Sequence, residues 1–145
     1  MMFNSILVLC TGNICRSPIA ERILRDAFPK KEIDSAGLSA VVGKPADPSA
    51  IHIAEKHGIS LEGHKGKQFT ASMGRQYQLI LVMEQQQLEQ ISNLAPELRG
   101  KTMLLGHWNG NKNIPDPYKK SDEAFASVYK LIENSCNAWI SKLAG

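Results

Sequence analysis

Apolar residues along the chain form two kinds of pattern, short unbroken runs and longer stretches with helical spacing. The runs within residues 6–9 and 78–83 predict strands that are buried on both faces of a sheet. Weaker strand patterns cover residues 32–37 and 101–105. The chain is therefore expected to contain four strands, separated by segments with a different periodicity.

Helical spacing fills the segments between these strands. After Ser17 and Pro18, apolar residues recur at intervals of three and four, and proline is well suited to the first helical position. The segments 47–57 and 84–93 are also predicted to be helical. Ser121 is expected to cap a long final helix, whose apolar positions include Phe125, Val128, Ile132, Trp139 and Leu143.

The alternation of strands and helices is typical of α/β proteins. We predict a single domain over residues 1–145, with a central four-stranded parallel sheet and helices on both faces. Ligands of such folds bind at the carboxyl ends of the strands. Cys10 ends the first apolar run, so it is expected at that edge of the sheet.

Composition and charge exclude several classes of protein. No segment approaches the roughly 18 apolar residues of a membrane span, and the first residues lack the basic start of a signal peptide. We therefore expect a cytoplasmic protein without membrane insertion. The net charge of +3 is mild and its lysines are dispersed, which argues against a nucleic-acid partner. A weak positive field suits an anionic substrate equally well.

The cysteines do not indicate a disulfide scaffold or a metal site. The chain has three, Cys10, Cys15 and Cys136, and an odd, low number is atypical of disulfide-stabilised proteins. Cys10 and Cys15 are not followed by a second pair of metal ligands, and the histidines are scattered. We expect neither a metal ion nor an organic cofactor.

The segment CTGNICRS, from Cys10 to Ser17, has the form C-x5-R-S and joins the first strand to the first helix. Gly12 and Asn13 both tolerate positive φ, so the loop can curl its backbone N–H groups around a centre. The start of the helix adds partial positive charge there. This arrangement predicts a binding site for an anion of phosphate size.

Two side chains give this loop its chemistry. Arg16 carries a planar guanidinium that matches two phosphate oxygens. Cys10, in the positive potential of the loop, is expected to act as a thiolate nucleophile, and the Ser17 hydroxyl can donate a hydrogen bond to it. The alternative is that Cys10 is only a small buried residue at the end of a strand. That alternative leaves Arg16 and the turn unexplained.

Other residues keep two interpretations. Cys15 either packs under the loop or takes part in its chemistry, whereas Cys136 is expected in the core beside Ile132 and Trp139. In IPDPYKKS, Asp116 between two prolines either donates a proton to a leaving group or only forms a turn before the last helix. Tyr118 would then form an aromatic wall of the site.

Five segments of the chain are similar to one known family. They are CTGNICRSPIAE near the start, DSAG at 34–37, HKGKQF at 64–69, LILVMEQ at 79–85 and IPDPYKKS near the end. Together they resemble the low-molecular-weight protein-tyrosine phosphatases over nearly the whole length. The resemblance implies the three-layer sandwich of the phosphotyrosine phosphatase I-like fold.

The resemblance also implies a role for each matching residue. Cys10 would be the nucleophile, Arg16 the phosphate clamp, and Asp116 the general acid and later the general base. The rest of the phosphate-binding loop would be Thr11, Gly12, Asn13, Ile14, Cys15 and Ser17. Ser35 and His64 would brace that loop together with Asn13 and Ser17. The pocket would be lined by Tyr118, Thr11, Ile14, and the aliphatic pair Leu38 and Val41.

Two segments differ from the usual family pattern. Residues 37–43 read GLSAVVG, which gives an aliphatic wall where eukaryotic members often have an aromatic residue. Gly66 and Lys67 stand where the family commonly has Ala-Arg. The segments LEGH and RGKTMLLGHWN look most like the bacterial branch tied to capsule and exopolysaccharide export. The implied partner is a phosphotyrosine protein, the tail of an autophosphorylated bacterial tyrosine kinase, and the implied state is a monomer.

Two other functions compete with phosphatase activity. An arsenate reductase on the same scaffold would need further cysteines after the third strand, and residues 83–93 contain none. A non-catalytic phosphotyrosine-binding module would lack the nucleophile or the acid, whereas Cys10, Arg16 and Asp116 are all present. Both alternatives are therefore disfavoured.

Overall fold

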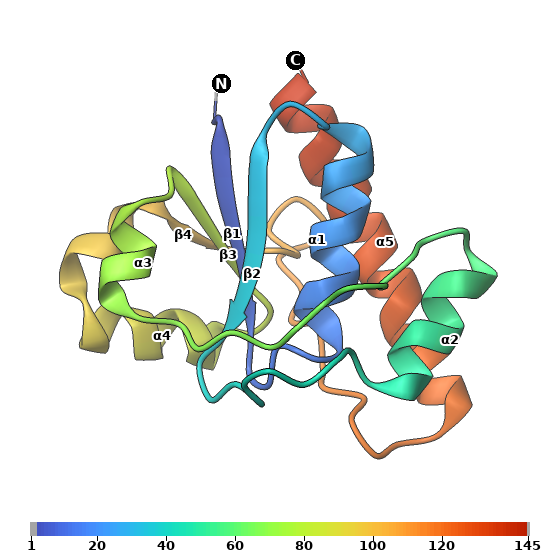
Figure 1. Ribbon diagram of the computed structural model, residues 1–145. Helices are drawn as coiled ribbons and strands as arrows, with labels where there is room; N and C mark the ends of the chain where they lie inside the picture. The colour runs from blue at the N-terminus through green and yellow to red at the C-terminus, as the bar shows by residue number, and fades with distance from the viewer. Residues whose placement is uncertain (1–2, 145) are drawn as a thin grey trace.

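The computed structural model describes residues 3–144. The elements in chain order are β1 (Ser5–Cys10), α1 (Arg16–Ala27), β2 (Glu32–Gly37), α2 (Pro48–Lys56), α3 (Ala71–Arg75), β3 (Leu79–Val82), α4 (Gln85–Leu94), the 3₁₀ helix η1 (Pro96–Lys101), β4 (Thr102–Leu104) and α5 (Asp122–Ala144). The strands form one parallel sheet in the order β2-β1-β3-β4 (Figure 1). The predicted α/β fold with a four-stranded parallel sheet is confirmed.

Helices cover both faces of the sheet, as predicted. Helices α1, α2 and α5 lie on one side and α3 and α4 on the other (Figure 1). Side chains of β1 alternate between the two cores, because successive strand residues point to opposite faces. Ile6 and Val8 belong to the core under α1 and α5, whereas Leu7 and Leu9 belong to the core on the α4 side.

Most helix boundaries follow from local capping. Asp47 caps α2 by accepting a hydrogen bond from the Ser49 N–H, and Ser121 accepts one from the Ala124 N–H at the start of α5. Helix α1 begins at Arg16, ahead of its predicted start, and Pro18 therefore lies within the first turn. Proline is tolerated there because the first N–H groups of a helix have no partner inside it.

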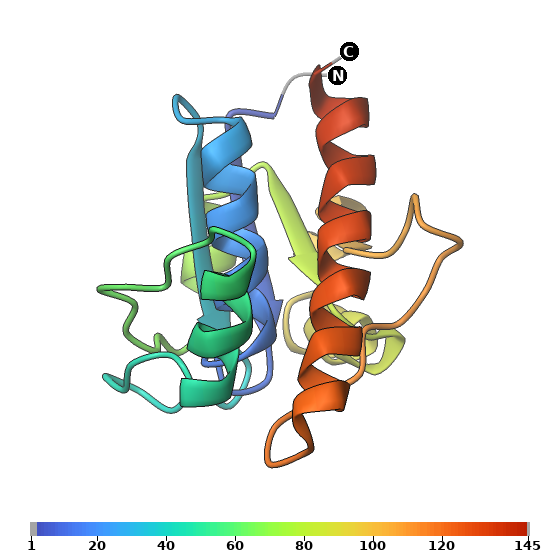
Figure 2. The ribbon, with the colours of Figure 1, turned by 90° about the vertical axis from the view of Figure 1, so that its right-hand side faces the viewer.

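Helix α5 runs beside α1 along one side of the molecule (Figure 2). Its predicted apolar positions are all buried, and so is Cys136, which confirms the core assignment of that cysteine. Within residues 3–144 no helix is both long and apolar enough to span a lipid bilayer.

Two short helices were not expected from the sequence. Helix α3 is a single short segment, capped by Thr70, which accepts a hydrogen bond from the Met73 N–H. The 3₁₀ helix η1 leads into β4. Segments of this length show too few turns for a periodic apolar pattern, so they depend on caps and on packing against the sheet.

Candidate active site

A cavity of about 190 Å³ opens at the carboxyl end of β1. The chain leaves β1 toward β2 on one side, and β3 pairs with β1 on the other, so the strand order reverses between β1 and β3. Crevices form at such reversals because the connections diverge. The cavity is lined by Cys10, Thr11, Gly12, Ile14, Cys15, Arg16, Ser39, Val41, Asp116 and Tyr118.

The loop between β1 and α1 forms the floor of this cavity. Asn13 adopts the left-handed conformation, with a φ of 58°, and its side chain is buried beneath the loop. Of the two residues that tolerate positive φ, only Asn13 adopts it, and Gly12 does not. A single left-handed residue is enough to turn the chain here. The hydrogen bonds of the Asn13 side chain offset the energetic cost of its left-handed backbone conformation.

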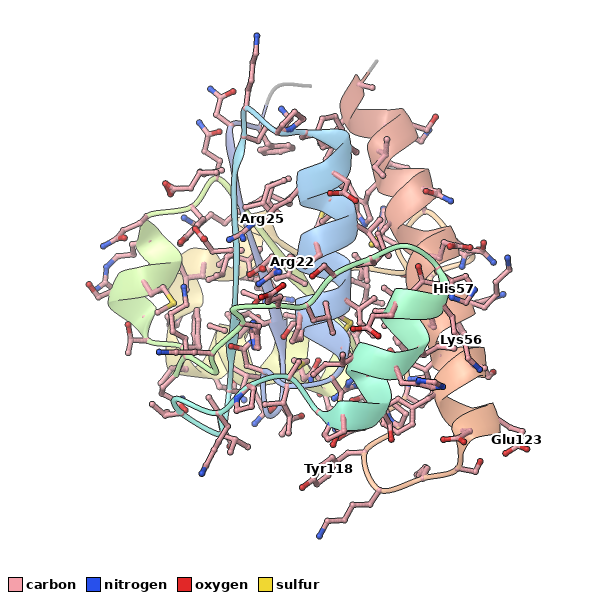
Figure 3. The ribbon with its side chains drawn as sticks, turned by 45° about the vertical axis from the view of Figure 1, so that its right-hand side comes forward. Arg22, Arg25, Lys56, His57, Tyr118 and Glu123 are labelled. Carbon is pink, nitrogen blue, oxygen red and sulfur yellow. The ribbon has the colours of Figure 1, made fainter. Side chains whose placement is uncertain are left out.

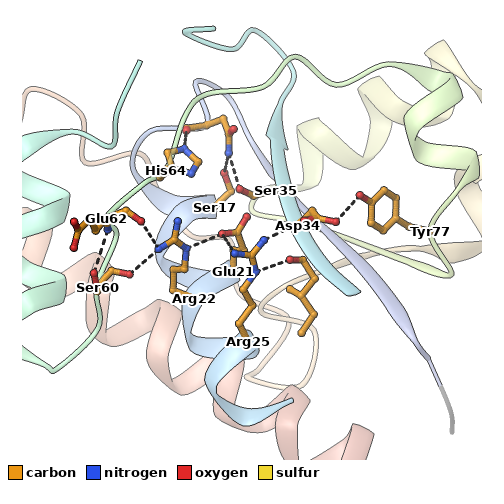
Figure 4. Close-up of polar contacts among 12 residues, drawn as sticks. Ser17, Glu21, Arg22, Arg25, Asp34, Ser35, Ser60, Glu62, His64 and Tyr77 are labelled. Atoms are coloured by element: carbon orange, nitrogen blue, oxygen red, sulfur yellow. Dashed lines mark hydrogen bonds and ion pairs between the residues drawn. The ribbon is translucent and has the colours of Figure 1, made fainter. Parts of the chain in front are cut away.

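Asn13 makes four hydrogen bonds to other parts of the chain, two as a donor and two as an acceptor. Its Nδ2 donates to Ser17 Oγ at 2.8 Å and to Ser35 Oγ at 3.0 Å. Its Oδ1 accepts from the Lys67 N–H at 2.9 Å. The His64 ring donates from Nε2 to the Asn13 carbonyl. Ser17, Ser35 and His64 are thus brought together around Asn13 (Figure 4), and the loop is fixed by side chains from α1, β2 and the segment before α3.

The surroundings of the His64 ring favour its neutral form. Burial lowers the pKa of His64 below its ordinary value, and the hydrogen bond to the Asn13 carbonyl opposes that effect. Since a carbonyl only accepts, the proton must be on Nε2. The buried imidazole therefore positions the loop without adding a charge beneath it.

Three charged residues of α1 fix the two segments that contain His64 and Ser35. Arg22 donates to the carbonyl oxygens of Ser60 and Glu62, just before His64, and its Nε pairs with the buried Glu21 carboxylate at 2.9 Å. Arg25 lies 3.5 Å from the same carboxylate. Arg25 also binds β2, through the carbonyl of Ile33 and the carboxylate of Asp34 (Figure 4). The loop between β1 and α1 is therefore supported by ion pairs that lie behind the residues bonded to Asn13.

The Cys10 sulfur lies at the base of the cavity, 3.0 Å from Ser17 Oγ. Ser17 already accepts a hydrogen bond from Asn13, so its own proton is free to point toward Cys10. A hydroxyl donor in that position stabilises a negatively charged sulfur. Cys10 is only 2% exposed, which leaves its sulfur reachable from within the cavity alone.

The Arg16 guanidinium is fixed along one edge. Nη1 donates to Glu84 Oε1 and to the Ile114 carbonyl, both at 2.7 Å. Nη2 lies 3.3 Å from Thr11 Oγ1, which also accepts a bond from Gln87. The side chain is 1% exposed, so its orientation is set by these partners. A buried, oriented guanidinium beside the loop is the geometry that binds two oxygens of a phosphate.

Asp116 lies across the cavity from the loop, in the segment before α5. Its Oδ1 accepts from the Tyr118 N–H at 3.0 Å, and its Oδ2 is 3.8 Å from Arg16 Nη2. The side chain is 45% exposed at the mouth of the cavity. The two interpretations of Asp116 are therefore compatible, because one oxygen forms the turn while the other faces the cavity.

The walls of the cavity differ from the expectation at one position. Val41 and Tyr118 line it, but Leu38 does not. Leu38 packs instead against the core on the α4 side, together with Ala36. The two residues follow the alternation of β2 and point to the same face of the sheet. Ser39, the next residue, faces the cavity in place of Leu38.

Cys15 lies in the loop beside the cavity and is 4% exposed. Burial, reinforced by the nearby Asp47 carboxylate, raises the pKa of the Cys15 thiol well above its ordinary value. Cys15 is therefore a neutral thiol and contributes to packing under the loop. Cys15 also lines the same cavity as Cys10, so its thiol can react with the Cys10 sulfur if that sulfur is oxidised.

The sequence interpretation missed several residues that position the site. Glu84 and Gln87 act on the loop from the start of α4, where they also form a capping box. Their position directly after a buried strand was a usable signal, because the carboxyl ends of neighbouring parallel strands meet at one edge. Arg22 and Glu21 gave no such signal, since they resemble the ordinary polar face of a helix.

Comparisons with known proteins agree with this geometry. Residues 5–145 match the family described as low molecular weight phosphotyrosine protein phosphatase. The chain is 54% identical to the low molecular weight protein-tyrosine-phosphatase Wzb of Escherichia coli strain K12, covering 98% of this chain and 97% of that protein. It is 52% identical to Etp of the same strain, covering 99% of this chain and 97% of that protein.

A solved structure shows the same arrangement in three dimensions. The tyrosine phosphatase Wzb from Escherichia coli K30, crystallised in complex with sulphate, superposes with a TM-score of 0.96 at 61% identity. The match covers 98% of this chain and 99% of that structure. The chain therefore belongs to the low molecular weight phosphotyrosine protein phosphatase family.

Proposed function

We propose that the protein hydrolyses phosphotyrosine in other proteins through a phosphocysteine intermediate on Cys10. The proposal rests mainly on one observation, the Cys10 sulfur at the base of a cavity that also exposes Arg16 and Asp116. These residues supply a nucleophile, an oxyanion clamp and a proton donor around one space. No metal ion or organic cofactor takes part in the proposed reaction.

In the first step, the phosphoryl group is held by the loop N–H groups and by the free edge of Arg16. The Cys10 thiolate attacks phosphorus in line with the tyrosine oxygen, so that the S–P bond forms as the P–O bond breaks. Asp116 donates its proton to the departing phenolic oxygen. Val41 and Tyr118 flank the aromatic ring of the substrate at the mouth of the cavity.

In the second step, the same groups act in reverse. Asp116, now ionised, removes a proton from a water molecule, which attacks phosphorus and breaks the S–P bond. The electron pair returns to sulfur, and the Ser17 hydroxyl stabilises the thiolate that leaves. Inorganic phosphate then dissociates, and the enzyme is ready for another cycle.

The proposed substrate is the phosphorylated tail of a bacterial tyrosine kinase that controls capsule or exopolysaccharide production. The Wzb and Etp relatives are named as protein-tyrosine-phosphatases, which supports phosphotyrosine in a protein as the substrate. The choice of a kinase tail rests on the resemblance of the segments LEGH and RGKTMLLGHWN to the bacterial branch. We propose that the protein acts in the cytoplasm as a monomer with one phosphatase domain. Arsenate reduction is not favoured, because Cys136 is buried in the core and does not line the cavity.

Turnover of a phosphotyrosine peptide tests the proposal most simply. The purified protein should release inorganic phosphate from that peptide and from aryl phosphates, without added metal and in the presence of a chelator. A protein that binds the phosphopeptide without releasing phosphate would instead be a binding module. Thiol-dependent reduction of arsenate in place of phosphate release would favour the reductase.

The Arg16→Lys variant is expected to lose about 10²- to 10³-fold in kcat/KM, the usual effect of removing one oriented oxyanion donor. Lysine is a point charge and cannot bind Glu84, the Ile114 carbonyl and two phosphate oxygens together. The measurement is steady-state kinetics with a phosphotyrosine peptide. Arg75→Lys, which alters an exposed pair with Glu97, is the matched control. A near-normal kcat/KM for Arg16→Lys would remove this residue from the site.

Mild peroxide is expected to produce a reversible disulfide between Cys10 and Cys15. Peroxide converts the Cys10 thiolate to a sulfenic acid, and the Cys15 thiol condenses with it to form the S–S bond and release water. Peptide mapping should find this crosslink, and thiol treatment should restore activity. In Cys15→Ala the sulfenic acid has no partner and peroxide oxidises it further to a sulfinic acid, which thiols do not reduce, so recovery should be poor. Equal recovery in both proteins would show that Cys15 only packs.

A further inference from the structure

Lys119 has an unusual backbone conformation beside the cavity. Its φ of 61° places it in the left-handed region, which is unfavourable for residues other than glycine, asparagine and aspartate. The chain nevertheless carries a lysine at this position, directly after a residue that lines the cavity. An unfavourable conformation retained next to a site is a reason to ask what the side chain does there.

The left-handed turn directs the Lys119 side chain back over Tyr118. The Nζ atom lies 5.5 Å from the centroid of the Tyr118 ring, within the range of a cation–π contact. Tyr118 itself is 44% exposed and lines the cavity. The ammonium group therefore lies against an exposed ring that forms one wall of the cavity.

The charge of Lys119 is not neutralised by the protein. Among residues 3–144, no carboxylate lies within 4.0 Å of its Nζ. Asp122 and Glu123 follow closely in sequence, yet neither pairs with it. Figure 3 shows Tyr118 and Glu123 on opposite sides of the loop that precedes α5. An unpaired ammonium beside a substrate cavity is available to a charged group of the substrate.

The neighbouring lysine provides an internal comparison. Lys120 lines a second hollow of about 160 Å³, together with Pro115, Pro117, residues of α5, and Asp116, which also borders the Cys10 cavity. Neither lysine lines the cavity that contains Cys10, but the Lys119 ammonium lies over the ring of Tyr118, which does line it. The two adjacent lysines thus carry the same charge on different surfaces of one loop.

We propose that Lys119 forms a subsite for an anionic group that lies close to the phosphotyrosine in the substrate chain. This inference rests on the proposed phosphotyrosine phosphatase activity and adds a sequence preference to it. The anionic group is either a carboxylate side chain or the phosphate of a second phosphotyrosine. Either group can form an ion pair with the Lys119 ammonium, and the phosphate carries more negative charge than the carboxylate.

The expected preference is modest for a carboxylate and larger for a phosphate. Exposed ion pairs change equilibria by a few-fold at most, because water and salt screen them. We expect kcat/KM to be about threefold higher for a peptide with a flanking glutamate than for the same peptide with glutamine. A second phosphotyrosine should give a larger ratio, and both ratios should fall as salt rises.

The test compares three peptides that share one phosphotyrosine and differ in the residues beside it. These residues are glutamine, glutamate or a second phosphotyrosine, placed on either side. Each peptide is measured with wild type, Lys119→Asn and Lys120→Asn. Asparagine tolerates positive φ, so Lys119→Asn removes the charge while it keeps the turn. The readout is the ratio of kcat/KM between anionic and neutral peptides, so a general change in activity cancels.

Wild type and Lys120→Asn should prefer the anionic peptides, and Lys119→Asn should lose that preference. A preference for both anionic peptides identifies any nearby anion as the ligand, and a preference for the doubly phosphorylated peptide alone identifies a phosphate. The proposal is overturned if wild type shows no preference, or if Lys119→Asn keeps it. Failure of the phosphatase assignment is distinct, since then no peptide releases phosphate.

Discussion

The Cys10→Ser variant is expected to release no measurable phosphate from phosphotyrosine peptides, a loss of at least about 10⁴-fold in kcat. A serine hydroxyl is un-ionised near neutral pH and is a far weaker nucleophile than a thiolate. The phosphate-binding loop should stay intact, because Asn13, Ser35 and His64 hold it without the sulfur. The variant should therefore still bind inorganic phosphate and phosphopeptides.

Kinetics and calorimetry together separate these two expectations. Steady-state assays measure turnover, and titration calorimetry measures phosphopeptide binding. Cys136→Ala serves as a control, because Cys136 lies on α5 in the hydrophobic core and does not line the cavity. That variant should lose thermal stability but keep its turnover. Substantial activity in Cys10→Ser would remove Cys10 as the nucleophile, and loss of binding would show that the sulfur also holds the loop together.

The Asp116→Asn variant is expected to hydrolyse phosphotyrosine peptides about 10²- to 10⁴-fold more slowly, the usual contribution of general acid catalysis. Asparagine keeps the size of the side chain and can still accept the bond from the Tyr118 N–H. It cannot supply the proton that the phenolic oxygen needs. The tyrosine leaving group is a phenol with a pKa of about 10, so its unassisted departure is slow.

The dependence of kcat on the leaving group identifies this role. Aryl phosphates with more acidic phenols need less protonation, so Asp116→Asn should slow them less. A plot of log kcat against the pKa of the leaving phenol should be nearly flat for wild type and steep for the variant. If the two plots have the same slope, Asp116 forms only the turn before α5, and the proton comes from another group.

The sequence was sufficient to predict the sheet, because its strands are coded by local patterns. The run from Ile6 to Leu9 is wholly buried, as a strand between two helical layers must be. The caps Asp47 and Ser121 also act locally, through bonds to N–H groups two and three residues away. By contrast, α3 and η1 are too short to produce a periodic pattern and depend on tertiary packing.

The Cys10–Ser17 loop could be recognised in the sequence as a candidate site because its residues are contiguous. Cys10, Arg16 and Ser17 lie in one turn between a strand and a helix, and this context predicts anion binding from local structure alone. The partners of Arg16 could not be predicted in the same way. Glu84 and the Ile114 carbonyl meet Arg16 only after the β3 and β4 connections fold against β1.

The support behind the loop was hidden for a different reason. Glu21 and Arg22 occupy positions of α1 that a helical pattern assigns to solvent, yet the Glu21 side chain is only 6% exposed. The segment from Ser60 to His64 covers this part of the helix, and no periodicity of α1 indicates that covering. Leu38 shows the opposite case, since continuing the alternation of β2 by one step would have placed it in the core.

Trapping the covalent intermediate is the most direct test of the central claim. Enzyme is mixed with a phosphotyrosine peptide that carries a radiolabelled phosphate, quenched within milliseconds under conditions that preserve phosphocysteine, and mapped by mass spectrometry. The mechanism predicts label on Cys10, which forms with the first release of dephosphorylated peptide and decays as inorganic phosphate appears. Turnover at the normal rate without label on Cys10, or with label on another residue, would contradict the mechanism.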